Sequence, residues 1–177
     1  MKGLRGLRGL RKVEEVEVVI ELQLPQPPQP LQPLQLQYPS FPSKTFPNHY
    51  TIVTGLYPAH HGLVDNTYLD VASGKLYSMG NKKMVSDGKW YGGTPLWVLA
   101  EQQKMLSASF FWVASEADIQ GIKPTYHYIY NDKIDIATRI KAVKDWLSLP
   151  EDLRPHFITF YFPDVDHDAH TYGPDDI

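Results

Sequence analysis

The feature that most constrains the fold is a helix-like pattern followed by a strand-like run in the last third of the sequence. Four apolar residues recur at the spacing i, i+4, i+7 and i+11: Ile136, Ile140, Val143 and Leu147. This spacing predicts one apolar face of a helix, which Pro150 ends. The run His156–Phe162 is aromatic and β-branched, which predicts a buried strand. A helix followed by a strand is half of a β-α-β unit, so the sequence predicts an α/β fold with a largely parallel sheet.

Cap and turn residues predict the elements that come earlier. They are a helix at Pro47–Thr54 ended by Gly55, a hairpin at Tyr68–Tyr77 around Ser73-Gly74, a helix that Thr94 caps and Pro95 opens through about Gln103, and a strand at Leu106–Trp112. The aromatic residues here are expected in the core rather than at a cofactor: Trp90, Tyr91, Trp97, Phe110, Phe111 and Trp112. Three histidines are expected to be structural or exposed rather than metal ligands: His49, His60 and His61.

Residues 1–38 differ in composition from the rest of the chain. Three copies of Gly-Leu-Arg occupy residues 3–11, with a period that matches neither a helix nor a strand. Val13–Leu22 alternates enough between Val or Ile and Glu to predict one amphipathic strand. Residues 22–38 are only Leu, Gln and Pro apart from Tyr38, which predicts polyproline II or disorder. We therefore expect a low-complexity leader at 1–38 and a folded region at 39–177.

Overall composition excludes several classes of protein and of site. The 42% apolar residues suffice for one core, and the formal net charge of −3 gives no basic footprint for nucleic acid. No apolar run reaches the roughly 18 residues that span a bilayer. The chain has no cysteine, which excludes disulfides and thiolate zinc sites. Any metal must therefore be held by His, Asp or Glu.

A hydroxyl at a helix entrance is the first chemical signal. Thr45 lies two residues before Pro47, at the entrance of the predicted helix Pro47–Thr54. As an N-cap it would accept a backbone N–H, a contribution of about 1 kcal/mol. As a nucleophile it would use the unpaired N–H groups and positive dipole end of the helix to hold a phosphate, and it would need a metal or base for activation. The residues alone favour the cap.

The second signal is the acidic segment Asp164–His170, just beyond the predicted strand His156–Phe162. Loops at the carboxyl ends of parallel strands are where ligands bind in open sheets. Three carboxylates and two imidazoles within seven residues could supply oxygen and nitrogen ligands for Zn²⁺. The alternative is an exposed acidic loop, since Asp is common in turns. Composition does not separate the pair Asp166/His170 from the pair Asp164/His167.

Several blocks of this sequence resemble one enzyme family. They are Lys44-Thr-Phe-Pro-Asn-His-Tyr-Thr-Ile-Val-Thr-Gly-Leu-Tyr-Pro58, His61-Gly-Leu-Val-Asp-Asn66, Gly93-Thr-Pro-Leu-Trp97, Phe111-Trp112, Pro124, Tyr130-Asn131 and Asp166-His-Asp-Ala-His-Thr-Tyr-Gly-Pro174. In this order they resemble the ectonucleotide pyrophosphatase/phosphodiesterases of the alkaline phosphatase superfamily, over roughly residues 39–176. The resemblance implies an alkaline-phosphatase-like α/β fold, with helices on both faces of the sheet, and hydrolysis of phosphodiester or pyrophosphate bonds.

The resemblance also implies site roles, which reverse the preference at Thr45. Thr45 matches the family's nucleophile, which ligates zinc and takes up the phosphoryl group covalently. Asn66 matches a donor to a nonbridging phosphate oxygen. Asp166 and His170 match two ligands of the second of two zinc ions, which leaves His167 and Asp168 as bystanders. Phe46 and Tyr130 match the aromatic pair that sandwiches a nucleotide base.

Departures from the family pattern lead to a further expectation. The family's catalytic domain begins with a buried strand that ends in Asp-Gly, and the upstream strand candidate Val13–Leu22 has no Asp. Of six zinc-ligating side chains besides the nucleophile, only Asp166 and His170 are found. We therefore expect an incomplete catalytic domain that is inactive in isolation. The alternatives are a related hydrolase of lipid headgroups, phosphonates or sulfates, and a non-catalytic binding remnant. The complete protein is expected to be periplasmic or extracellular.

Overall fold

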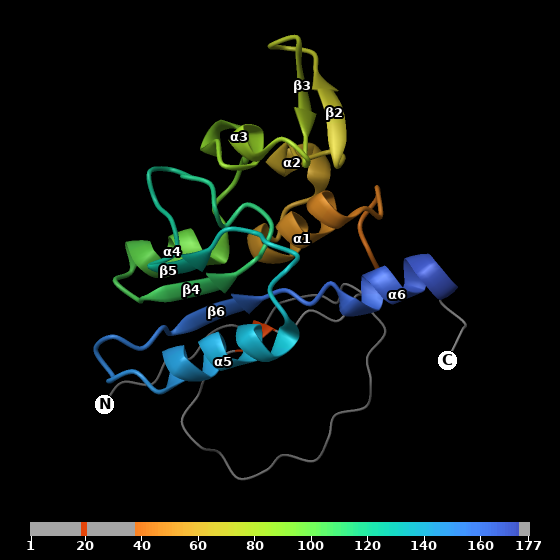
Figure 1. The fold of residues 1–177 in the computed structure, drawn as a ribbon. Coiled ribbons are helices and arrows are strands. Elements are labelled where there is room, and N and C mark those ends of the chain that lie inside the picture. The colour runs from red at the N-terminus through yellow and green to blue at the C-terminus, as the bar shows by residue number, and fades with distance from the viewer. Residues whose placement is uncertain (1–18, 21–37, 174–177) are drawn as a thin grey trace.

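A four-stranded sheet with the order β1-β6-β4-β5 organises the computed structural model, which describes residues 19–20 and 38–173 (Figure 1). Its strands are β1 (Val19–Ile20), β4 (Ser107–Phe110), β5 (Tyr126–Tyr128) and β6 (Phe157–Phe160). Strands β5, β4 and β6 run parallel, and β1 pairs antiparallel with β6. The prediction of an α/β fold with a largely parallel sheet is therefore confirmed. The predicted leader lies outside the described residues, except for the two residues of β1 and Tyr38.

Six helices and one 3₁₀ turn accompany the sheet in the described residues, together with a hairpin. They are α1 (Thr45–Thr54), α2 (Pro58–His61), α3 (Lys82–Val85), the 3₁₀ turn η1 (Gly88–Trp90), α4 (Leu96–Gln102), α5 (Ile136–Leu147) and α6 (Asp164–Tyr172). The hairpin joins β2 (Thr67–Asp70) to β3 (Lys75–Ser78). No helix in the described part of the chain is long and apolar enough to cross a membrane.

Helices cover both faces of the sheet, and they bury its central strand β4 (Figure 1). All four residues of β4 are buried. On one face lie α1 and α4, and on the other lies α5 (Figure 1). One apolar cluster contains Tyr50 of α1 and Trp97 of α4 together with Trp112, and the other packs Val143 and Trp146 of α5 against the sheet. The expectation that the aromatic residues form core is confirmed, since all six that were singled out are buried.

Helix and turn signals were accurate where a glycine marks a boundary. Gly55 ends α1 in the left-handed conformation, at φ 68°, and its N–H bonds to Thr51 O. Gly74 takes φ 66° in the turn of the hairpin, as Ser73-Gly74 predicted. The Asp135 side chain caps α5 by accepting the N–H of Thr138 at 2.8 Å. All three residues act locally, and the sequence pattern located the two glycines, whereas the Asp135 cap was not predicted.

Two predictions about helices were wrong in detail. The N-cap of α4 is Pro95 rather than Thr94, and the Thr94 hydroxyl instead accepts from Gln120 Nε2 at 2.9 Å. On α5 the expected apolar face is rotated, because Ile136 and Ile140 are exposed. The helix buries a different set: Arg139, Val143 and Trp146.

Arg139 explains the rotation of α5. Its Nε donates to Ile134 O at 2.8 Å, and its guanidinium lies 5.2 Å from the centre of the Phe111 ring. A cation over an aromatic face is favourable and buries the long side chain. A charged residue on the buried face is invisible to a search for apolar periodicity.

Candidate active site at the end of the parallel strands

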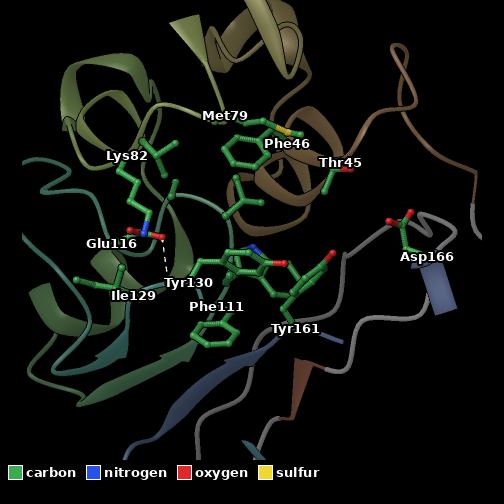
Figure 2. A pocket seen from close by; sticks show the side chains of 15 residues that line it. Thr45, Phe46, Met79, Lys82, Phe111, Glu116, Ile129, Tyr130, Tyr161 and Asp166 are labelled. Carbon is green, nitrogen blue, oxygen red and sulfur yellow. Dashed lines mark hydrogen bonds between the residues drawn. The ribbon is translucent and has the colours of Figure 1, made fainter. Parts of the chain in front are cut away.

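A cavity of about 440 Å³ lies beyond the carboxyl ends of β4, β5 and β6, as expected for a ligand site in an open sheet (Figure 2). Residues from several elements line it: Thr45, Phe46, Met79, Lys82, Phe111, Glu116, Ile129, Tyr130, Tyr161 and Asp166 among others. Figure 2 shows Thr45 and Asp166 toward one end and Lys82 and Glu116 toward the other. Four of the residues that the sequence singled out therefore share one cavity: Thr45, Phe46, Tyr130 and Asp166.

Thr45 is the first residue of α1 and is not its cap. The N-cap is Lys44, in an extended conformation, and it makes no side-chain capping bond. The alternative interpretation of Thr45 as an N-cap is therefore wrong. The Thr45 carbonyl accepts a hydrogen bond from Nδ1 of the buried His49, one turn along the helix. Its half-buried side chain lines the cavity, so the hydroxyl is accessible to a bound molecule.

Asn66 meets the first turn of α1 from a distant part of the sequence. Its Oδ1 accepts the backbone N–H of Phe46 at 2.9 Å, across 20 residues. This bond satisfies one of the N–H groups that a helix start leaves unpaired. Because the oxygen of the amide is engaged, its Nδ2 group remains a donor, and it makes no hydrogen bond to the residues that the structure describes.

A bidentate ion pair lies beside this hydrogen bond. Lys44 Nζ is 2.9 Å from both Oδ1 and Oδ2 of Asp65. Asp65 Oδ1 also accepts the backbone N–H of Asn66 at 2.6 Å. The hydrogen bond from Lys44 is the main cause that lowers the pKa of Asp65, so this carboxylate is ionised at neutral pH.

Aromatic side chains line the middle of the cavity. The Phe46 ring lies 6.4 Å from the Tyr77 ring, and the Tyr130 ring lies 5.2 Å from the Phe111 ring in an edge-on arrangement. The backbone N–H of Tyr130 donates to Glu116 Oε1 at 3.3 Å. Phe46 and Tyr130 lie far apart in the sequence and line the same cavity (Figure 2). Planar apolar ligands fit such a space.

The acidic segment is a helix, so its expected loop conformation was wrong. Residues Asp164–Tyr172 form α6, which begins just after β6. One turn of this helix separates Asp166 from His170, and Asp166 Oδ1 lies 3.6 Å from His170 Nε2. In the alternative register, His167 Nδ1 lies 3.8 Å from Oδ1 of its neighbour Asp168.

The donor types of Asp166 and His170 fit zinc, and their number is below that of a complete site. An imidazole nitrogen and a carboxylate oxygen at i, i+4 on one helix face can bind the same ion. Both side chains are exposed, at 57% for Asp166 and 81% for His170. No group of three or more His, Asp or Glu that could hold a metal occurs within residues 19–20 and 38–173.

The cavity residues that were missed as site candidates include Phe111, Glu116 and Lys82. Phe111 directly follows β4 and has a φ of 66°, which is rare for a bulky residue. Its position just past the carboxyl end of a parallel strand was a usable signal. Lys82 begins the short helix α3 and Glu116 lies in a turn, and no pattern in the sequence marks either residue.

The histidines that were expected to be structural behave as such where they are buried. His61 is fully buried, donates from Nε2 to Thr51 Oγ1 at 3.0 Å and accepts the N–H of Leu63 at Nδ1. Desolvation lowers the pKa of His61 to about 4, so it is neutral in the folded protein.

Comparisons with known proteins identify a family for this chain. Residues 35–177 match the family model described as type I phosphodiesterase / nucleotide pyrophosphatase. Human ectonucleotide pyrophosphatase/phosphodiesterase family member 1 is 46% identical over 136 residues, which cover 77% of this chain and 15% of that protein. The venom phosphodiesterase of Macrovipera lebetinus is 42% identical over 134 residues, which cover 76% of this chain and 16% of the relative.

Solved structures of the same family resemble this chain in fold. Murine ectonucleotide pyrophosphatase/phosphodiesterase 5 superposes with a TM-score of 0.72 at 29% identity, over 78% of this chain and 36% of that one. An inactive threonine-to-alanine variant of the murine protein in complex with AMP also has a TM-score of 0.72, at 28% identity. The chain thus spans about a sixth of the first curated relatives and about a third of these structures. By sequence and by its alkaline-phosphatase-like fold, the chain belongs to the type I phosphodiesterase/nucleotide pyrophosphatase family.

Proposed function

We propose that this chain carries part of the active site of a zinc-dependent hydrolase of phosphodiester or pyrophosphate bonds in nucleotide-type substrates. The observation that carries the proposal is the cavity that Thr45, Phe46, Tyr130 and Asp166 line together. A hydroxyl, two aromatic rings and a metal-type ligand there match the parts of a substrate with a phosphoryl group and a flat base.

Thr45 is the proposed nucleophile. The Thr45 hydroxyl gives up its proton to water as its oxygen attacks phosphorus, and the bond from phosphorus to the leaving oxygen breaks. The leaving group departs with the electron pair of that bond, and the phosphoryl group, still carrying its nucleoside, is esterified to Thr45 as a phosphothreonine. Water then attacks the same phosphorus, the bond to Thr45 breaks, and the hydroxyl regains a proton. The relative whose threonine-to-alanine variant is described as inactive supports a requirement for a hydroxyl in this family.

Asn66 is the proposed donor to the phosphoryl oxygen. Its Oδ1 is held by the N–H of Phe46, which leaves the two Nδ2 hydrogens as donors at the start of α1. A preorganised donor of this type stabilises charge that grows on a nonbridging oxygen during attack. The same hydrogen bond links Asn66 to the residue next to Thr45.

Asp166 and His170 are the proposed ligands of one zinc ion, and Thr45 is the proposed ligand of a second. Zinc, when bound, lowers the pKa of a coordinated hydroxyl or water and offsets the charge of the phosphoryl group. Asp166 and Thr45 line the same cavity, toward the same end of it in Figure 2, which supports a position of the zinc ligand near the reacting group.

Phe46 and Tyr130 are the proposed binding surface for the nucleobase. Stacking between rings suits any base, since every base has a flat π face. The AMP bound to the murine relative supports a nucleotide ligand.

The test is hydrolysis of the p-nitrophenyl ester of thymidine 5′-monophosphate by the full-length gene product that contains this chain, with zinc present. We expect turnover that stops on removal of zinc and returns when zinc is added back. Absence of zinc-dependent turnover in a folded, zinc-loaded protein would contradict the proposal.

A further inference from the structure

The segments on either side of Thr45 are joined to residues 65–66 at two points. Before Thr45, Lys44 Nζ binds both oxygens of Asp65 at 2.9 Å. After Thr45, the N–H of Phe46 donates to Asn66 Oδ1 at 2.9 Å. These contacts connect residues about 20 apart in sequence, so they hold one loop against the start of α1.

The Asp65 carboxylate connects the ion pair to the backbone of Asn66. Its Oδ1 accepts the Asn66 N–H at 2.6 Å while it binds Lys44. Lys44 is also the N-cap of α1 and supplies no capping side chain. The cap comes instead from Asn66, and Asp65 determines where the backbone of Asn66 lies.

We propose that Lys44 and Asp65 are positioning residues, whose ion pair holds the Thr45 hydroxyl and the Asn66 Nδ2 donor in register. This inference rests on the proposed function, because the ion pair affects catalysis only through the proposed roles of Thr45 and Asn66. Neither Lys44 nor Asp65 is among the residues that line the cavity. The pair therefore acts through its neighbours.

The exposure of the pair indicates that its role is local. The Lys44 side chain is 52% exposed and that of Asp65 is 30% exposed. Ion pairs at such positions contribute little to global stability. A small displacement of reacting groups, in contrast, can lower a rate by roughly a hundredfold. Loss of the pair should thus reduce turnover while the fold persists.

The experiment is a double-mutant cycle with Lys44→Met and Asp65→Asn in the full-length gene product. The matched control is the exposed Lys141–Asp145 pair on α5, at 2.6 Å, changed by Lys141→Met and Asp145→Asn. Turnover of the p-nitrophenyl thymidylate ester gives kcat and KM. Hydrogen exchange by mass spectrometry reports the N–H groups of residues 44–48, independently of activity.

We expect each single variant and the double variant to lose a similar factor in kcat, about tenfold, with little change in KM. Exchange at residues 44–48 should accelerate in all three, and Lys44→Arg should restore both kcat and protection because it keeps the pair. The melting temperature should change no more than in the Lys141–Asp145 control.

Three results would overturn the proposal. Unchanged kcat and unchanged exchange in Asp65→Asn would show that the pair positions nothing. Additive losses would show that Lys44 and Asp65 act independently, with Lys44 acting on the substrate directly. A global loss of stability would show an ordinary structural pair. Failure of the proposed function is distinguishable, since it would leave wild-type turnover absent while the exchange experiment still measures the coupling.

Discussion

Asp166 Oδ1 lies 3.6 Å from His170 Nε2, one turn apart on α6. Both side chains are more than half exposed. An oxygen and a nitrogen at this separation can coordinate the same metal ion, and zinc binds both carboxylate oxygens and imidazole nitrogens. The helix brings the two side chains together, because residues at i and i+4 lie on the same helix face.

The first prediction concerns zinc affinity. Asp166→Asn and His170→Ala should each weaken zinc binding by at least about tenfold, because loss of even an outer-sphere partner costs roughly 10- to 100-fold. Isothermal titration of zinc into the full-length gene product measures the change.

The matched controls for zinc binding are Asp164→Asn and His167→Ala, which change the same residue types on the same helix. They should leave zinc affinity within about twofold of the unchanged protein. If the control variants lose more zinc affinity than Asp166→Asn and His170→Ala, the zinc ligands are Asp164 and His167 instead.

The second prediction concerns Tyr130 and the class of substrate. Base stacking contributes roughly 1–3 kcal/mol, so Tyr130→Ala should raise KM for a nucleotide ester by about 5- to 150-fold. KM for bis(p-nitrophenyl) phosphate, which has no base, should change far less. Steady-state kinetics on both substrates measures the difference.

Two controls accompany the Tyr130 experiment. Tyr130→Phe keeps the ring and should retain most of the affinity, and Tyr38→Ala removes an exposed ring outside the cavity, which should have no effect. Equal losses on the two substrates would favour the lipid-headgroup or sulfate alternative.

The third prediction concerns acid stability and His61. Burial lowers the pKa of His61 to about 4 from its ordinary 6.5, so the folded state favours the neutral ring. This contribution is complete above pH 6.5, where the unfolded chain is also neutral, and is lost progressively as pH falls from 6.5 to 4. Urea unfolding between pH 7 and pH 4.5 should therefore show a declining free energy of unfolding.

The variant that tests the His61 prediction is His61→Gln, which removes the titrating group. Its decline in stability over this pH range should be shallower than in the unchanged protein, whereas the exposed neighbour His60, changed to Gln, should leave the slope as it was. An identical slope in His61→Gln would show that another group causes the acid sensitivity.

The two central strands and three of the six described helices, α1, α4 and α5, followed from sequence because local residues determine them. Gly55 and Gly74 take positive φ angles where the chain must end a helix or turn, and Asp135 caps α5 with its own carboxylate. The buried run at 157–160 needs no distant partner to be read as a strand. These determinants act within a few residues of the structure that they specify.

The remaining features depend on contacts across the fold. Strand β5 is three residues long, and only its pairing with β4 identifies it. The buried Arg139 is stabilised by Phe111, which lies 28 positions earlier. The acidic segment was expected to be a loop because Asp is common in turns, and it forms a helix directly after β6.

In the candidate site, too, some features could be predicted from local residues and others depend on contacts across the fold. Thr45 could be located at a helix entrance, but its exclusion as a cap required the structure. Asn66 was named through family resemblance, and its bond to the N–H of Phe46 could not be read from either residue. Glu116 and Lys82 line the cavity without any local signal, because the fold alone brings their segments together.

The central claim is that Thr45 is the nucleophile, and the most direct measurement is zinc-dependent turnover in three variants of the full-length gene product. Thr45→Ala should lower kcat by roughly a thousandfold or more, since it removes the attacking oxygen. Thr45→Ser should retain partial activity because it keeps the hydroxyl, and Ser43→Ala, two residues away and exposed, should behave as the unchanged protein.

Acid quenching of the reaction completes the test by trapping the covalent step. With the p-nitrophenyl thymidylate ester, mass spectrometry of the quenched protein should find a thymidylyl adduct on Thr45 in the unchanged protein and none in Thr45→Ala. Turnover in Thr45→Ala equal to that of the unchanged protein, or an adduct on another residue, would contradict the account.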